Sequence, residues 1–107
     1  MWQLALSGKL WFNVGEVVVL YIDTHAHYDS EKFNSDRDAV LSEMPAAGIE
    51  AIIDPGCDEA SSLAALELGG RYDFVYAAVG WQPEEWESWD MYSPATVRRL
   101  AAHPKCV

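Results

Sequence analysis

The sequence is poor in basic side chains and carries an excess of acidic ones. Its 107 residues include 7 lysines and arginines and 17 aspartates and glutamates, so the formal net charge at pH 7 is −10. A surface of this charge does not attract nucleic-acid phosphates by itself, although a bound metal ion would supply local positive charge. The excess of carboxylates is therefore interpreted first as a solvated acidic surface.

Cysteine and long apolar runs are also scarce. Cys57 and Cys106 are far apart, which gives no disulfide framework and is typical of a reducing compartment. No apolar run reaches the length of a membrane span, and residues 1–10 lack the ordered parts of a signal peptide. We therefore expect a cytoplasmic protein with no membrane partner.

The densest chemical signal is the sequence Asp-Thr-His-Ala-His-Tyr-Asp at residues 23–29. The aliphatic run before it predicts a buried strand over 17–25 that ends in polar residues. Because side chains alternate along a strand, His25 and His27 are expected on one face, with Asp23 one pleat deeper.

These two histidines are candidate metal ligands. Two imidazoles at this spacing can hold one metal ion at a rigid strand end, and a carboxylate can accept the ring N–H that fixes the required tautomer. We therefore predict His25 and His27 as metal ligands, with Asp23 as the carboxylate behind them. The alternative is a pair of surface histidines, because a bare His-x-His sequence is common.

Strand patterns alternate with helical patterns along the rest of the chain. Short apolar runs predict further strands at 50–54 and 74–79, and Cys106-Val107 is interpreted as the start of a fourth. Pro55-Gly56 is expected to break the second strand. Alternation of this kind predicts a parallel sheet with right-handed helical crossovers, and half of the residues are hydrophobic, which is typical of a globular domain.

The first and third helices have recognisable start and stop signals. Ser35 is the candidate N-cap of the first, and Pro45 predicts its end near Met44. Ser93-Pro94 predicts the start of the third, because proline is favoured at the first helical position.

The second helix is predicted over 59–68, between Asp58 as the cap and Gly69-Gly70 as the stop. Leu63 and Leu66 are expected on its packing face. Asp58 is therefore interpreted as a helix cap before it is interpreted as a ligand, although it lies close to the end of the second strand.

Ligands of parallel α/β folds bind at the carboxyl ends of the strands, and the third such end is an acidic, tryptophan-rich loop over 81–90. The indole rings could stack on bases or sugars. We favour the alternative, in which the tryptophans pack the loop onto the rim of the fold and the carboxylates face water. The loop contains Trp81, Trp86 and Trp89, and Glu84, Glu85, Glu87 and Asp90.

The motif at 23–27, followed by Asp29, resembles the N-terminal signature of the TatD family of metal-dependent hydrolases and DNases. The resemblance continues through 47–53 and 72–80, in the same order and spacing, and covers residues 21–107. The first motif is specific, and the later segments support it.

The resemblance implies a partial TIM (β/α)8 barrel, with this chain holding the first three βα units and the start of strand four. It also implies a deoxyribonuclease or phosphodiesterase whose water is activated by one or two divalent metal ions, with Zn, Mg, Mn and Ni undistinguished. Nucleic acid or another phosphodiester is the implied substrate. The family's other ligands, a strand-four glutamate, two further histidines and a late aspartate, are not in this chain. We therefore expect an N-terminal fragment that is inactive alone.

Two positions depart from the family pattern. Gln82 stands where the family usually has the histidine of Gly-x-His-Pro, and Tyr28 stands where an aliphatic residue is usual. The Gln82 difference bears on substrate handling. Residues 1–16 do not fit the family and are interpreted as an extension or a misassigned start, with 17–107 as the N-terminal part of a TatD-like barrel.

Two alternatives remain. The first is a non-catalytic chain, either a truncated product or a scaffold that associates through an exposed sheet edge. The second is another amidohydrolase-like barrel that acts on an amide or lactone, because those enzymes also place His-x-His on the first strand.

Overall fold

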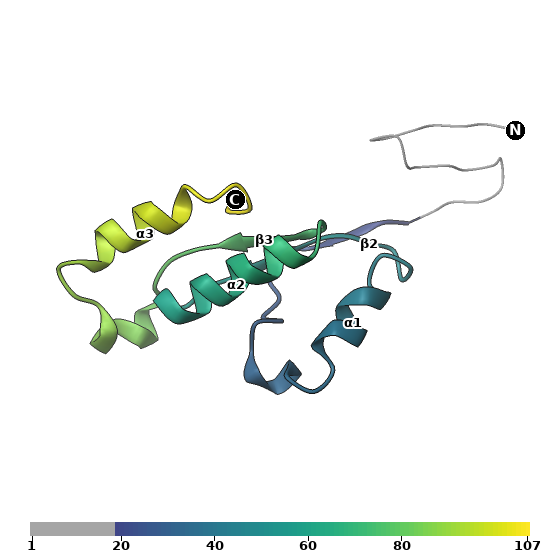
Figure 1. Ribbon diagram of the computed structural model, residues 1–107, viewed down its shortest axis with the longest axis horizontal. Coiled ribbons are helices and arrows are strands. Elements are labelled where there is room, and N and C mark those ends of the chain that lie inside the picture. The colour runs from purple at the N-terminus through teal and green to yellow at the C-terminus, as the bar shows by residue number, and fades with distance from the viewer. Residues whose placement is uncertain (1–18) are drawn as a thin grey trace, which may run out of the picture.

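A computed structural model describes residues 19–107 of the chain, so the predicted extension over 1–16 lies outside the described residues. The centre of the fold is a parallel sheet of three strands in the order β1-β2-β3. The strands are β1 (Tyr21–Asp23), β2 (Ile49–Pro55) and β3 (Val75–Ala78). The predicted α/β class and parallel pairing are therefore confirmed (Figure 1).

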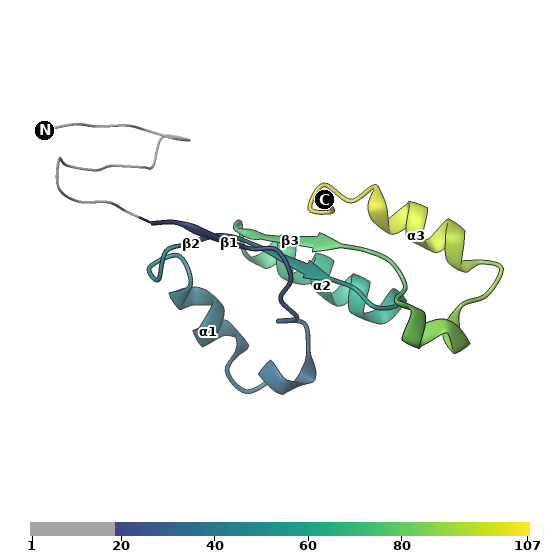
Figure 2. The same cartoon turned by 180° about the vertical axis from the view of Figure 1, so that it is seen from behind.

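A helix follows each strand. α2 lies in front of the sheet in Figure 1 and behind it in Figure 2, so it covers one face. None of the helices within residues 19–107 is long and apolar enough to cross a membrane. The helices are α1 (Arg37–Glu43), α2 (Glu59–Arg71) and α3 (Ser93–Ala101), and the 3-10 turns are η1 (Glu31–Phe33) and η2 (Pro83–Ser88).

The core lies between the sheet and its helices. Ile52 and Val75 are register partners on β2 and β3, and Leu41 of α1 and Leu68 of α2 pack with them. All four side chains are at most 4% exposed, and each contributes about 1.5–3 kcal/mol of burial free energy. The helices α1 and α2 therefore cover the same face of the sheet.

Alternation along β2 decides which face Asp54 occupies. Ile52 is 1% exposed and Asp54 is 0% exposed, whereas Ala51 and Ile53 between and beside them are only partly buried. Asp54 therefore points toward the helix-covered face, at the carboxyl end of the strand. Such a position is unusual for a carboxylate, because burial costs free energy unless its charge is compensated.

The chain begins a fourth strand beside β3. The Ala77 amide donates to the Lys105 carbonyl, and the Val107 amide donates to the Ala77 carbonyl, each at 2.9 Å. Ala77 and Cys106 form a parallel bridge. The segment Cys106-Val107, predicted as the start of a fourth strand, therefore pairs with β3 through an isolated bridge.

The boundaries of the first two strands differ from the sequence prediction. The predicted first strand over 17–25 begins outside the described residues, and β1 ends at Asp23, so His25 lies beyond it. Pro55 does not break β2 but forms its last residue, paired with Ala78. A proline is tolerated there because its missing N–H falls at the strand end, and the next amide, that of Gly56, donates to Ala78 at 2.7 Å.

The second helix differs from its prediction in length and in its buried face. It continues through Gly69-Gly70 to Arg71, and Leu63 is 45% exposed. A Cβ on Gly69 would lie 3.1 Å from Lys105 Cβ and 3.3 Å from the Val75 carbonyl oxygen. This glycine therefore permits close packing inside the helix and does not end it. The buried residues of α2 are Ser62, Ala65, Leu66, Leu68 and Gly69.

The first helix ends where predicted. Met44 is its C-cap, and Gly48 takes a φ of +90° in the turn that leads into β2, a conformation that favours glycine. Its N-cap is Asp36 and not Ser35, one residue later than expected. In the third helix, the predicted Pro94 lies in the first turn, after a start at Ser93.

Candidate metal centre

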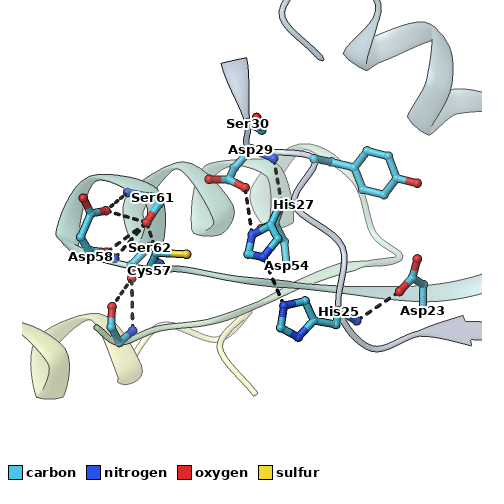
Figure 3. Close-up of polar contacts among 12 residues, drawn as sticks. Asp23, His25, His27, Asp29, Ser30, Asp54, Cys57, Asp58, Ser61 and Ser62 are labelled. Carbon is cyan, nitrogen blue, oxygen red and sulfur yellow. Dashed lines mark hydrogen bonds and ion pairs between the residues drawn. The ribbon is translucent and has the colours of Figure 1, made fainter. Parts of the chain in front are cut away.

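The two predicted histidine ligands meet just beyond the end of β1. Their Nε2 atoms are 3.2 Å apart, and the rings stand edge to face at 77° (Figure 3). They follow Asp23 in the loop, so it is the turn of this loop and not strand alternation that brings them together. Two nitrogens at this separation can share a proton, or can both coordinate one metal ion at about 2.0–2.1 Å.

Asp23 has a backbone partner. Its Oδ1 accepts the backbone N–H of His25 at 3.1 Å, and no contact with either imidazole ring is present among the described residues. A carboxylate that accepts an amide two residues later forms an Asx turn. Asp23 thus shapes the turn that carries the histidines.

A second group of ligand atoms lies on the other side of His27. Its Nδ1 is 3.7 Å from Asp29 Oδ1 and 4.0 Å from Asp54 Oδ1. His27, Asp29 and Asp54 each offer a ligand atom, all within 4.8 Å of one another. This grouping brings in two carboxylates that the sequence analysis did not assign as ligands.

Asp54 is fully buried and Asp29 is partly buried, and both carboxylates are incompletely paired. The backbone N–H of Asp29 donates to Asp54 Oδ2 at 2.9 Å. The Oδ1 atom of each residue is buried without a hydrogen-bond partner in the part of the chain that the structure describes. A buried carboxylate oxygen without a donor is costly, so these two atoms call for a shared proton, an imidazolium or a cation.

Burial and mutual repulsion also shift the pKa of the Asp54 carboxyl. Burial, and then the negative charge of Asp29, raise the pKa of the Asp54 carboxyl to about 7. Burial, and then the neighbouring carboxylates, also raise the pKa of the Cys57 thiol, which therefore stays protonated near neutrality. The carboxyl ends of β1 and β2 form a region of negative potential, which a cation would relieve.

The guanidinium of Arg37, on α1, holds the loop between β1 and α1. Arg37 donates to the carbonyls of Tyr28 at 2.6 Å, Asp29 at 3.2 Å and Ser30 at 2.8 Å. Three bonds from one planar group fix the backbone on either side of Asp29. The sequence analysis missed this role, because an arginine in the first turn of a helix gives no signal of loop contacts.

Asp58 lies close by but has a different role. Its side chain accepts the Ser61 amide at 2.8 Å, while the Asp58 amide donates to Ser61 Oγ at 3.0 Å, which completes a capping box. These hydrogen bonds hold the pKa of the Asp58 carboxyl below its usual range. The prediction of Asp58 as a cap is confirmed.

The tryptophan-rich loop follows β3 on the same edge of the sheet. The backbone N–H of Gln82 donates to the backbone carbonyl of Cys57 at 2.9 Å, which ties this loop to the segment after β2. Trp86 is 69% exposed and Trp89 is 46% exposed. The expectation that the tryptophans pack onto the rim is therefore wrong for Trp86, which lies in the turn η2, and for Trp89, which follows that turn.

The residues present fit a divalent cation. Imidazole nitrogen and carboxylate oxygen are ligands of zinc, manganese and related ions. A neutral His27 ring has one lone-pair nitrogen, so coordination through Nε2 leaves an Nδ1–H that faces the carboxylates. Coordination through Nδ1 would instead leave an Nε2–H that faces His25.

A family model described as TatD related DNase matches residues 22–107. The chain is 34% identical over 88 residues to the uncharacterised metal-dependent hydrolase YabD of Bacillus subtilis, an alignment that covers 82% of this chain and 34% of that protein. It is 31% identical over 86 residues to the 3'-5' ssDNA/RNA exonuclease TatD of Musicola paradisiaca, covering 79% of this chain and 33% of that protein.

The metal-dependent hydrolase YjjV of Escherichia coli is 34% identical over 67 residues, which are 63% of this chain and 26% of that protein. The chain therefore spans between 26% and 34% of the length of these curated relatives. The family match covers the sheet, its helices and the whole candidate metal centre. The chain belongs to the TatD-related DNase family.

Proposed function

We propose that this sequence belongs to a metal-dependent hydrolase that cleaves phosphodiesters of nucleic acid, as a TatD-type deoxyribonuclease. The observation that carries the proposal is the convergence of His25, His27, Asp29 and Asp54 at the carboxyl ends of adjacent parallel strands. Relatives named as ssDNA/RNA exonucleases support nucleic acid as the substrate class.

In this proposal, His25 and His27 would hold a divalent metal ion through their Nε2 atoms, which lie 3.2 Å apart. The Nδ1–H of His27 then faces Asp29 and Asp54, whose carboxylates orient the ring and raise its basicity. A divalent ion in this position supplies polarisation of a phosphoryl oxygen and a bound water of lowered pKa.

The remaining residues of the site position these groups. Asp23 fixes the turn through the His25 amide, and Arg37 fixes the loop that carries Asp29. The negative potential of the Asp29 and Asp54 carboxylates would attract the cation and would repel an anionic substrate that arrived without it. Metal loading is therefore expected to precede substrate binding.

We further propose that the three-stranded sheet is part of a (β/α)8 barrel. The parallel strands, the helices on one face and the fourth segment paired to β3 are the repeat from which such a barrel is built. The opposite face, which includes Ala51 and Ile53, would line the barrel interior. The family's additional metal ligands would come from beyond these 107 residues.

Substitution of His25 tests the proposal. In the full-length protein, His25→Ala should lower metal-dependent cleavage of single-stranded DNA by more than about 100-fold at limiting metal, because one imidazole ligand is lost. His103→Ala is the matched control, since His103 is exposed at the end of α3 and its Nδ1 accepts the Lys105 amide. Cleavage rates at graded Mn²⁺ and Zn²⁺ concentrations are the measurement, and unchanged activity of His25→Ala would refute the assignment.

A further inference from the structure

The loop between β3 and α3 forms an aromatic groove apart from the candidate metal centre. The groove has a volume of about 500 Å³, within the range of small-molecule sites. Trp81 and Trp89 meet edge to face, with centroids 5.3 Å apart and planes at 82°, and Trp86 adds a third ring. The groove is lined by Trp81, Gln82, Pro83, Trp86 and Trp89.

Two of the three indole rings are too exposed to serve mainly in packing the loop onto the rest of the fold. Trp86 is 69% exposed and Trp89 is 46% exposed, although each indole presents a large apolar surface to water. The Trp81 Nε1–H donates to Ser88 Oγ at 2.8 Å, and Ser88 Oγ donates to the Glu85 carbonyl at 2.8 Å. These bonds hold the loop in shape, so the groove is built by the loop's own contacts.

The charge of the loop is of one sign. Glu84, Glu85 and Glu87 lie in the short turn η2 with Trp86, between Trp81 and Trp89 in the sequence, and the sequence has no lysine or arginine between Arg71 and Arg98. The negative face of an aromatic ring attracts cations, and carboxylates in the same loop add negative charge near the groove, although none of them lines it. The phosphates of a nucleic acid strand would be repelled here.

We propose that this groove binds a small organic cation with a methylated, quaternary ammonium group, free in solution. The indole faces contact the methylated head group, and the glutamates of η2 supply the opposing charge. The backbone N–H of Gln82 donates a hydrogen bond to the Cys57 carbonyl. A bound cation would therefore lie on the same edge of the sheet as the candidate metal centre. The proposal does not depend on the proposed hydrolase activity.

Choline is the probe, and its uncharged isostere, in which carbon replaces the quaternary nitrogen, is the control ligand. The indole N–H resonances of the full chain, labelled with nitrogen-15, report binding at each tryptophan. Choline should shift the resonances of the groove tryptophans with a dissociation constant in the roughly millimolar range, and salt should weaken the binding. The isostere should produce little shift at the same concentration.

Two variants assign the binding to the groove. Trp86→Ala should weaken choline binding roughly three- to thirtyfold, whereas Trp86→Phe should retain part of it because a ring remains. Glu87→Gln should weaken it less. Tyr92→Ala is the matched control, because Tyr92 is equally exposed at 69% but does not line the groove.

Three results would overturn the proposal. The first is equal binding of the uncharged isostere, which would make the groove merely apolar. The second is tighter binding of thymidine monophosphate or a short single-stranded oligonucleotide, which would make it a base-stacking surface. The third is the absence of any shift in the wild-type chain at high choline concentration.

Discussion

The end of β2 and the start of α2 each carry an aspartate, four residues apart, in opposite surroundings. Asp54 is fully buried, has an oxygen without a partner among the described residues, and has a pKa raised to about 7. Asp58 accepts the Ser61 amide in a capping box, and its pKa is lowered. An aspartate side chain thus caps a helix with its hydrogen bonds formed at position 58, whereas at position 54 it is a buried carboxylate that a cation would stabilise.

This difference shows how a carboxylate of the candidate metal centre can be separated from a helix cap. Asp54 lies near the end of β2 and Asp58 follows the strand, so both lie near the carboxyl edge where ligands bind. The two aspartates differ in their donors. The first turn of α2 offers free amides to Asp58, whereas Asp54 accepts, among the described residues, the Asp29 amide from the loop after β1.

The largest expected effect is on the pH dependence of stability. The pKa of Asp54 is raised in the folded state from 3.8 to about 7, so its contribution is fully present below about pH 4 and is lost as the pH rises through about 7. In metal-free protein, wild type should lose up to roughly 4 kcal/mol relative to Asp54→Asn over this interval.

The measurement is urea unfolding of both proteins in the presence of a chelator at about pH 4.5 and about pH 8. These two values span most of the interval over which the contribution of Asp54 is lost. Asp58→Asn is the control and should follow wild type, because asparagine also caps helices. A constant difference between wild type and Asp54→Asn at both pH values would contradict the buried titration.

A smaller effect is expected at the helix cap. Asp58→Ala removes the acceptor for the Ser61 amide and should lower the free energy of unfolding by about 1 kcal/mol. Its metal affinity should equal that of wild type. Thermal unfolding and metal titration of the same variant check both statements, and a loss of metal affinity would mean that Asp58 is a ligand after all.

The sequence predicted the parts of the site that lie within one segment. His25 and His27 are two residues apart, so their proximity follows from local geometry, even though a turn produces it. The Asp29–Asp54 pair joins residues 25 positions apart through the alignment of two strand ends. Neither residue has a local signal for that contact, so only the folded chain identifies the pair.

The fold was predicted well in its elements and less well at their ends. Alternating strand and helix patterns predicted the parallel sheet, because burial follows the period of each element. Gly69 was misread as a helix stop. The reason for a glycine there is tertiary packing, because a Cβ would make tight contacts with Lys105 and Val75. The exposure of Trp86 was missed for a similar reason, since composition does not reveal which way a turn points its rings.

The measurement that tests the central claim most directly is calorimetric titration of Mn²⁺ into wild type, Asp54→Asn and Asp58→Asn. The claim is that Asp54, through its place beside His27, belongs to the metal centre and that Asp58 does not. Asp54→Asn should bind Mn²⁺ about 10- to 100-fold more weakly than wild type, and Asp58→Asn should bind it equally well. Equal affinity of Asp54→Asn and wild type, or an equal loss in both variants, would contradict the account.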